Sequence, residues 1–294
     1  MARLSADARS GRARATPRPP EEARPGAVAS GRHPIPRGSS ATGPEDPVTA
    51  HEGPPARAER HRVVVGDARL ALVLHLPESR RRAPCVVACH GLGASKDSDK
   101  YLLLAAEFTA AGLALARFDF RGCGESSGRE DETTIATRIE DVRAVLAWLA
   151  SHRRLDGRFG LLGSSLGGFV ALHVASARGD GAPVVTWNAP STLEALGEGS
   201  GEERPELGVP FFLELAEHTY LEAPRGVAGH LVVQAEADEV VPLEHGVALH
   251  ARAGDPCGLV LVEGADHRFT DPSHRKQAVA ASLEWFGRAF SRGS

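Results

Sequence analysis

Short apolar runs alternate with amphipathic helical patterns from about residue 61 to the C-terminus. Apolar runs of about four to eight residues predict buried strands, and apolar positions spaced three and four residues apart predict helices that cover a sheet. Strands are predicted at 61–66, 69–76, 84–89, 113–118, 159–162, 184–187, 231–234 and 258–262. Helices are predicted at 100–111, 133–150, 243–251 and 274–290, and a further one follows the strand at 159–162.

The order of these elements indicates an α/β fold. The first two strands are separated only by Asp67 and Ala68, which predicts a hairpin. The later strands have no polar face and are separated by helices, a pattern typical of a mostly parallel sheet covered on both faces. We therefore expect one eight-stranded α/β domain over residues 61–294, with its functional site at the carboxyl ends of the strands.

The first 60 residues differ in composition from the rest. They contain ten of the 20 prolines, and ten arginines against seven acidic residues give them a charge of +3. With −4 for the whole chain, −7 remains for residues 61–294. A segment that buries so little apolar surface is expected to be disordered. The arginines suggest a nucleic-acid-binding arm as an alternative, but the interspersed acids dilute the field, so we expect no nucleic-acid partner.

The remaining composition favours a cytoplasmic protein without a membrane partner. The chain shows neither the apolar core of a secretory signal nor an apolar run of about 18 residues. Its four cysteines, Cys85, Cys89, Cys123 and Cys257, lack the spacing of a metal site. Free thiols in a reducing compartment are therefore expected.

Candidate chemistry centres on the segment GSSLG at 163–167, between a predicted strand and a predicted helix. A nucleophile at such a turn sits in a strained backbone conformation, and the residues two before and two after it must be small. Gly163 and Gly167 satisfy this requirement for Ser165, whereas leucines flank Ser164 at the same spacing. The segment alone would also fit a glycine-rich turn that ends a core strand.

The turn HGLG at 90–93 follows another predicted strand and could supply part of an oxyanion hole. Its glycines allow the backbone N–H of Leu92 to point at a substrate carbonyl, and the N–H of Leu166 would be the second donor. For the His90 side chain we favour a bracing role.

An acid and a base are expected after later strands. Asp238 is the preferred acid, because Glu236 and Glu239 beside it are interpreted as solvated loop charges. His267 is the preferred base among thirteen histidines, because it follows a core strand and comes after Asp238 in the chain.

Together these segments resemble the α/β-hydrolase superfamily over roughly residues 61–294. The matching motifs are HGLG at 90–93, FDFRGCGES at 118–126, GSSLG at 163–167, DEVVP at 238–242 and GADH at 264–267. The chain is most similar to the esterase-like branch that includes bacterial feruloyl or cinnamoyl esterases and serine aminopeptidase-like hydrolases. One departure is Gln234–Ala235, where relatives usually have His–Gly before the acid loop.

The resemblance implies a Ser165–His267–Asp238 triad with Leu92 and Leu166 as oxyanion donors, and Asp119 and Arg121 as a pair that braces loops. This chemistry requires no cofactor and no metal. The expected partner is a small-molecule ester, and we leave a homodimer open.

Residues 192–226 are predicted to form a small cap insertion over the site. Eight glutamates against two arginines give this segment a charge of −6. One interpretation is a field that disfavours phosphorylated or CoA-linked substrates; a solvated helical face is the alternative. The apolar residues proposed as substrate contacts are Phe211, Phe212, Leu215 and Tyr220.

Three functions fit the sequence. The first is a serine hydrolase of small carboxylic esters, and the second is an aminopeptidase or amidase that uses the same triad. The third is a catalytically silent hydrolase fold used for binding, which the filled catalytic positions disfavour. Acyl and alcohol specificity are not encoded in any motif.

Overall fold

A computed structural model describes residues 57–79, 81–197 and 207–291 of the 294-residue chain. The described residues all belong to one compact unit that spans His51–Ser294. The predicted tail at 1–60 lies outside them except for residues 57–60, which open the first strand.

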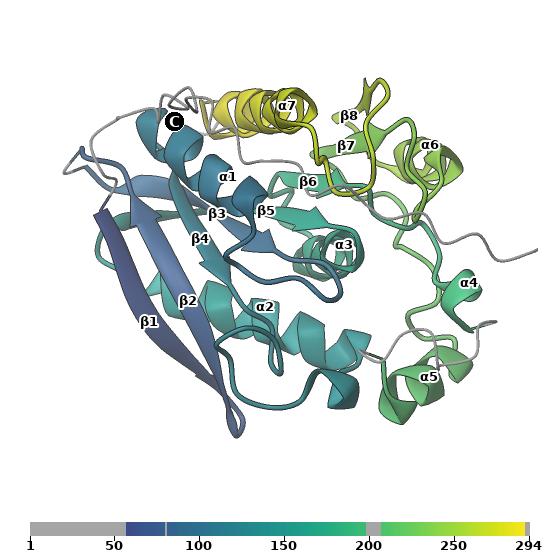
Figure 1. Cartoon of the computed structure of the whole chain (residues 1–294). Helices are drawn as coiled ribbons and strands as arrows, with labels where there is room; N and C mark the ends of the chain where they lie inside the picture. The colour runs from purple at the N-terminus through teal and green to yellow at the C-terminus, as the bar shows by residue number, and fades with distance from the viewer. Residues whose placement is uncertain (1–56, 80, 198–206, 292–294) are drawn as a thin grey trace, which may run out of the picture. The chain divides into compact units, whose positions relative to one another are not determined.

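The domain is built on one eight-stranded sheet in the order β1-β2-β4-β3-β5-β6-β7-β8 (Figure 1). β1 pairs with β2, and β2 with β4, in antiparallel register, and the remaining neighbours are parallel. The predicted α/β class and mostly parallel sheet are thereby confirmed. The strands are β1 (Arg57–Val65), β2 (Ala68–Leu76), β3 (Ala83–Cys89), β4 (Ala114–Phe118), β5 (Leu155–Ser164), β6 (Val184–Trp187), β7 (His230–Ala235) and β8 (Cys257–Val262).

Two strands begin earlier than their apolar runs predict. β1 starts at Arg57, where pairing with Leu76 continues through a charged stretch. Charged side chains are common on edge strands, because they discourage pairing with other chains. β5 starts at Leu155 rather than Phe159, and includes Asp156 and Arg158, which form an ion pair with each other.

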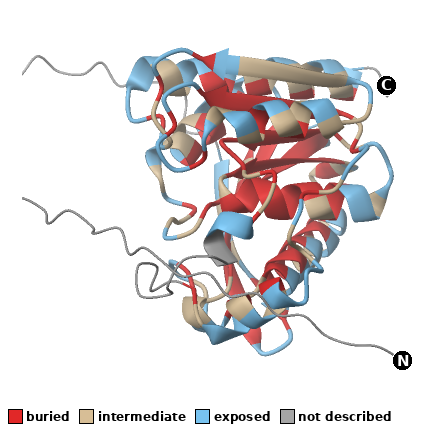
Figure 2. Ribbon diagram, turned by 90° about the vertical axis from the view of Figure 1, so that its right-hand side faces the viewer, coloured by how far each residue is buried: buried red, intermediate tan, exposed pale blue. Residues whose placement is uncertain are grey.

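Side-chain alternation along the central strands supplies two separate cores. In β3, Cys85, Val87 and Cys89 point to one face of the sheet, and Val86 and Ala88 point to the other. The first face is covered by α2 (Ile135–Ala150), α3 (Leu166–Arg178) and α6 (Leu243–Arg252). The second is covered by α1 (Asp99–Ala110) and α7 (Pro272–Ser291). Figure 2 shows the buried positions along the sheet and on the helix sides that face it.

The shorter elements are the 3-10 helix η1 (Glu130–Glu132), α4 (Glu194–Gly197) and α5 (Val209–Ala216). The last two lie in the predicted cap insertion, of which residues 198–206 are outside the described residues. All four cysteines are free thiols, as expected. Among the described residues, no helix combines the length and apolar character needed to cross a bilayer.

Candidate active site

The turn between β5 and α3 holds Ser165 in an unusual backbone conformation. Its φ of 54° and ψ of −128° lie in a region that L-residues rarely adopt. A Cβ on Gly163 would come within 2.3 Å of the Gly167 carbonyl oxygen, and one on Gly167 within 2.3 Å of the carbonyl oxygens that precede the 91–93 turn. Both positions therefore require glycine, which is the steric condition predicted for a nucleophile at this turn.

The turn after β3 packs directly against Ser165. A Cβ on Gly91 would lie 3.0 Å from the Ser165 Cβ, so glycine permits this approach. Leu92 lines the pocket in front of Ser165. Leu166 is the first residue of α3, and its N–H has no acceptor within the helix. Leu92 thus lines the same pocket as Ser165, and Leu166 follows Ser165 directly in the chain.

The loops after β7 and β8 bring Asp238 and His267 together. Nδ1 of His267 lies 2.8 and 2.9 Å from the two carboxylate oxygens of Asp238. The carboxylate also accepts hydrogen bonds from the N–H groups of Val240 and Val241, at 2.9 and 2.7 Å. The Asp238 side chain is fully buried, so these donors fix its position and replace water around its charge.

Two residues that the sequence reasoning did not assign to the site hold these loops in place. Asn188, buried after β6, donates to the His267 carbonyl (2.9 Å) and accepts from the Ala235 N–H (2.7 Å). Its position directly after a predicted strand, at the sheet edge that carries the site, was the available signal. Gln234 donates to the Val241 carbonyl at 3.0 Å. The glutamine that departs from the family pattern therefore braces the acid loop.

A pocket of about 630 Å³ opens over this edge of the sheet. Ser165 and His267 both line it, and Asp238 lies behind the imidazole. Among the described residues, no hydrogen bond joins the Ser165 hydroxyl to His267. The lining residues are Gly91, Leu92, Gly93, Ala94, Ser98, Asp99, Lys100, Ser164, Ser165, Val240, His267, Arg268, Thr270 and Arg275.

The predicted bracing residues act through separate partners. The buried Asp119 carboxylate accepts from the Lys96 N–H at 2.7 Å and pairs with the Lys96 ammonium at 3.0 Å. Arg121 instead binds Asp141 of α2, at 2.6 Å. His90 bridges the Gly91 carbonyl and the N–H of the residue after Asp119. Burial lowers the pKa of His90 to about 4, so it is a neutral brace.

The four apolar residues proposed as substrate contacts are not in the pocket wall. Phe211 and Leu215 are buried in the core next to α2, and Phe212 and Tyr220 pack against the same cluster. The reason is the docking of α5 on the start of α2, where Glu214 accepts hydrogen bonds from two free helix N–H groups at 2.5 and 2.9 Å. The apolar side of α5 therefore faces the core.

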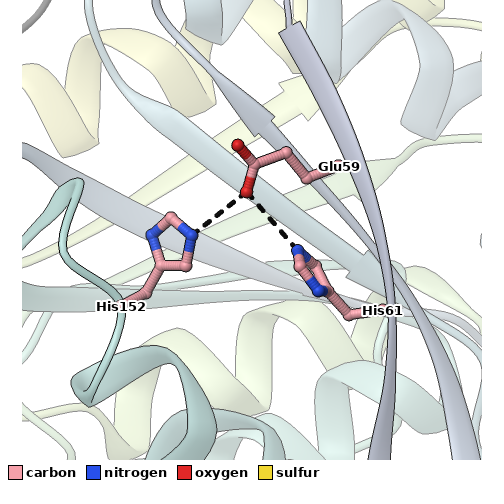
Figure 3. Close-up of side chains that lie close together, drawn as sticks. All are labelled: Glu59, His61 and His152. Carbon is pink, nitrogen blue, oxygen red and sulfur yellow. Dashed lines mark hydrogen bonds and ion pairs between the residues drawn. The ribbon is translucent and has the colours of Figure 1, made fainter.

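One His/Glu group in the described chain has ligand atoms close enough for a metal ion, and it lies at the edge strand (Figure 3). Glu59 Oε2 is 3.1 Å from Nε2 of His152 and 3.5 Å from Nε2 of His61. Nδ1 of His152 accepts from the Arg154 N–H, so its Nε2 carries the proton and donates to Glu59. Burial raises the pKa of Glu59, but the interactions with His152 and His61 outweigh burial and hold the pKa below its usual value. Glu59 thus ties β1 to the turn after α2 through His152, whereas the buried Nε2 of His61 has no hydrogen-bond partner among the described residues.

Comparison with known proteins supports the same fold. Residues 66–192 match the family described as X-Pro dipeptidyl-peptidase (S15 family). An uncharacterized 31.7 kDa protein of the traX-finO intergenic region of Escherichia coli is 38% identical over 113 residues. That match covers 37% of this chain and 37% of the relative, so the chain spans little more than a third of the relative's length.

Two solved structures superpose on most of the domain. Est1E of Butyrivibrio proteoclasticus with bound ferulic acid gives a TM-score of 0.68 at 17% identity, over 79% of this chain and 99% of the other. Mouse alpha/beta hydrolase domain-containing protein 10 gives 0.65 at 20% identity, over 79% and 100%. Such identities establish the fold alone. With its sheet order and its strand–Ser165–helix turn, this chain has the α/β-hydrolase fold.

Proposed function

We propose that this protein is a serine hydrolase that cleaves small carboxylic esters through Ser165, His267 and Asp238. The observation that carries the proposal is the hydrogen bond from His267 to the buried Asp238, beside a pocket that Ser165 also lines. The strained backbone of Ser165 supports it independently, because such a conformation costs about 1–3 kcal/mol and is kept where function needs it.

The chemistry follows from these positions. Nε2 of His267 takes the Ser165 proton as the hydroxyl oxygen attacks the ester carbonyl, and Asp238 stabilises the resulting imidazolium. The N–H groups of Leu92 and Leu166 stabilise the oxyanion, each by about 3–4 kcal/mol of the barrier. His267 then protonates the departing alcohol, and water attacks the acyl-enzyme by the same route in reverse.

Proton transfer requires Ser165 Oγ to come within about 3.2 Å of His267 Nε2. Rotation about the Cα–Cβ bond of Ser165 moves its hydroxyl within the pocket, and hydrogen bonds of this kind often tighten only when substrate is bound. Asn188 and Gln234 keep the partner loops fixed during this motion.

A second candidate is cleavage of an amide or peptide bond by the same residues. The match of residues 66–192 to a dipeptidyl-peptidase family favours it. Release of 4-nitroaniline from aminoacyl anilides would identify it, whereas the ester proposal predicts turnover of short 4-nitrophenyl esters and little release from anilides.

The test is a substrate panel on the full chain, on Ser165→Ala and on Ser176→Ala, which changes an exposed serine of the same helix. We expect Ser165→Ala to lose about 10⁴-fold or more in kcat, and Ser176→Ala to match the parent. Ester turnover that survives in Ser165→Ala would overturn the proposal.

A further inference from the structure

The pocket beside Ser165 has an unbalanced charge. Three cationic side chains line it: Lys100 from α1, Arg268 from the loop after β8, and Arg275 from α7. Asp99 is the only carboxylate in the described lining, which leaves an excess of two positive charges. Because the pocket adjoins the proposed nucleophile, this excess acts where a substrate would lie.

Arg268 is exposed and has no hydrogen-bond or ion-pair partner among the described residues. Arg275 binds the carbonyl oxygens of Phe269 and Thr270 at 3.2 and 3.3 Å. Its contact with Asp99 is long, at 3.6 Å, and that carboxylate is 81% exposed. Both guanidinium groups therefore keep capacity for an anion.

Lys100 is held near the nucleophile by a neutral group. Its ammonium donates to the Ser164 hydroxyl at 2.8 Å, one residue before Ser165. Burial, together with the positive charges of Arg268 and Arg275, lowers the pKa of Lys100 to about 8. Besides these two arginines, the charged or titratable groups around the pocket are Asp99 and His267. A bound anion would reduce the electrostatic repulsion among these three cations.

We propose that this pocket binds an anionic group of the substrate, a carboxylate or a phosphate, through Lys100, Arg268 and Arg275. The inference rests on the proposed hydrolase function and names its substrate class. Guanidinium groups suit this role because they bind carboxylates and phosphates through paired N–H donors. The acidic composition of residues 192–226 suggested that phosphorylated or CoA-linked substrates are disfavoured. The pocket cations indicate the opposite, an anionic substrate.

Two of the four described glutamates of that segment are paired outside the pocket. Glu214 binds the N-terminus of α2, and Glu222 forms ion pairs with Arg252 and Arg225 at 3.3 and 3.8 Å. Neither glutamate lines the pocket. Their charges are thus used in docking the segment on the domain, and the field in the pocket is set by its own cations.

The first experiment compares two esters that differ by one charge. The substrates are 4-nitrophenyl hydrogen glutarate, which carries a free carboxylate, and its neutral methyl ester. We expect the full chain to prefer the charged substrate in kcat/KM by about tenfold or more, and Arg268→Gln to reduce this ratio about tenfold. Lys276→Gln removes an exposed cation of α7 outside the pocket and should leave the ratio unchanged.

A second pair of substrates determines on which side of the scissile bond the anionic group lies. S-Acetyl-4′-phosphopantetheine and S-acetylpantetheine differ only in the phosphate of the leaving group. A preference confined to the glutarate pair places the anion on the acyl part, and one confined to the thioester pair places it on the leaving group. Equal rates within both pairs would overturn the inference.

Two further readouts separate this inference from the proposed function. Turnover of the neutral ester tests the hydrolase function alone. Binding of glutarate to Ser165→Ala, measured by calorimetry, tests the anion site without catalysis. This binding should weaken about tenfold when Arg268→Gln is combined with Ser165→Ala.

The pH dependence of KM tests the contribution of Lys100. With the charged ester, KM should rise above about pH 8 as Lys100 loses its proton, and KM for the methyl ester should not change in this way. Glutarate binding that is indifferent to Arg268 would refute the anion site.

Discussion

Two groups of cationic side chains in this domain have different surroundings. The first group, Lys96 and Arg121, supports the loops around the site. Each of the two forms an ion pair with a buried carboxylate: Lys96 with Asp119 at 3.0 Å, and Arg121 with Asp141 at 2.6 Å. Lys100 and Arg275 belong to the pocket group and are held mainly by hydroxyl and carbonyl oxygens. Cations that hold the fold are neutralised by protein carboxylates. Cations held by neutral oxygens keep their charge available for a ligand.

The largest expected effect comes from Asp119→Asn, in the first group. The amide would turn its NH₂ toward either the Lys96 N–H or the Glu125 N–H, which both donate to Asp119, and would leave the Lys96 ammonium without its buried counter-charge. We expect a loss of about 3 kcal/mol in the free energy of unfolding, measured by urea denaturation. Unchanged stability would mean that this buried pair contributes as little as a surface pair.

Arg121→Gln should have a smaller effect in the same direction. It removes the guanidinium contacts to Asp141, but the carboxylate keeps its hydrogen bond from the residue 121 N–H at 2.9 Å. We expect a loss of about 1–2 kcal/mol by the same measurement. A loss greater than that of Asp119→Asn would reverse the order of importance of these two ties.

Lys100→Met, in the second group, should act in the opposite direction. Because the pKa of Lys100 falls from its usual 10.5 to about 8, the unfolded chain binds more protons between these values. The charged form therefore costs stability below pH 8, and that cost disappears as pH rises to 10.5. We expect the variant to be more stable by about 1 kcal/mol at pH 7, after allowance for solvent screening.

The pH series provides the control for this prediction. The difference in thermal midpoint between Lys100→Met and the parent should shrink between pH 8 and 10.5. A variant that is less stable at pH 7 would show that Lys100 is a structural cation like Lys96.

Lys276→Gln should produce the smallest effect. The side chain is exposed on α7 outside the pocket, so its removal should change the free energy of unfolding by less than about 0.5 kcal/mol. A larger change, measured beside Lys100→Met, would show that the net charge of the domain matters more than the position of each cation.

Much of this fold could be predicted from the sequence, because its central strands are continuous apolar runs. Boundaries were missed where charged residues extend a strand, as at Arg57 and Asp156. The glycine spacing around Ser165 could also be read directly, since the steric demand at that turn is local. Such features depend on residues that are close together in the chain.

The pocket wall could not be predicted in the same way. An apolar face such as that of Phe211 and Leu215 fits a core as well as a pocket, and only the docking of α5 decides between them. Lys100 and Arg275 come from helices at opposite ends of the domain sequence and meet only when α1 packs beside α7. The charge of a pocket therefore depends on which helices and loops pack together, and it cannot be inferred from the net charge of one segment of the sequence.

The role of Ser165 is tested most directly by covalent labelling. The full chain is treated with a fluorophosphonate, and the modified residue is located by mass spectrometry of its peptides. We predict one equivalent of label on Ser165 and its loss after His267→Ala, because the hydroxyl reacts only when the imidazole removes its proton. Label on another residue, or equal labelling of Ser165 in the presence and absence of His267, would contradict the proposed mechanism.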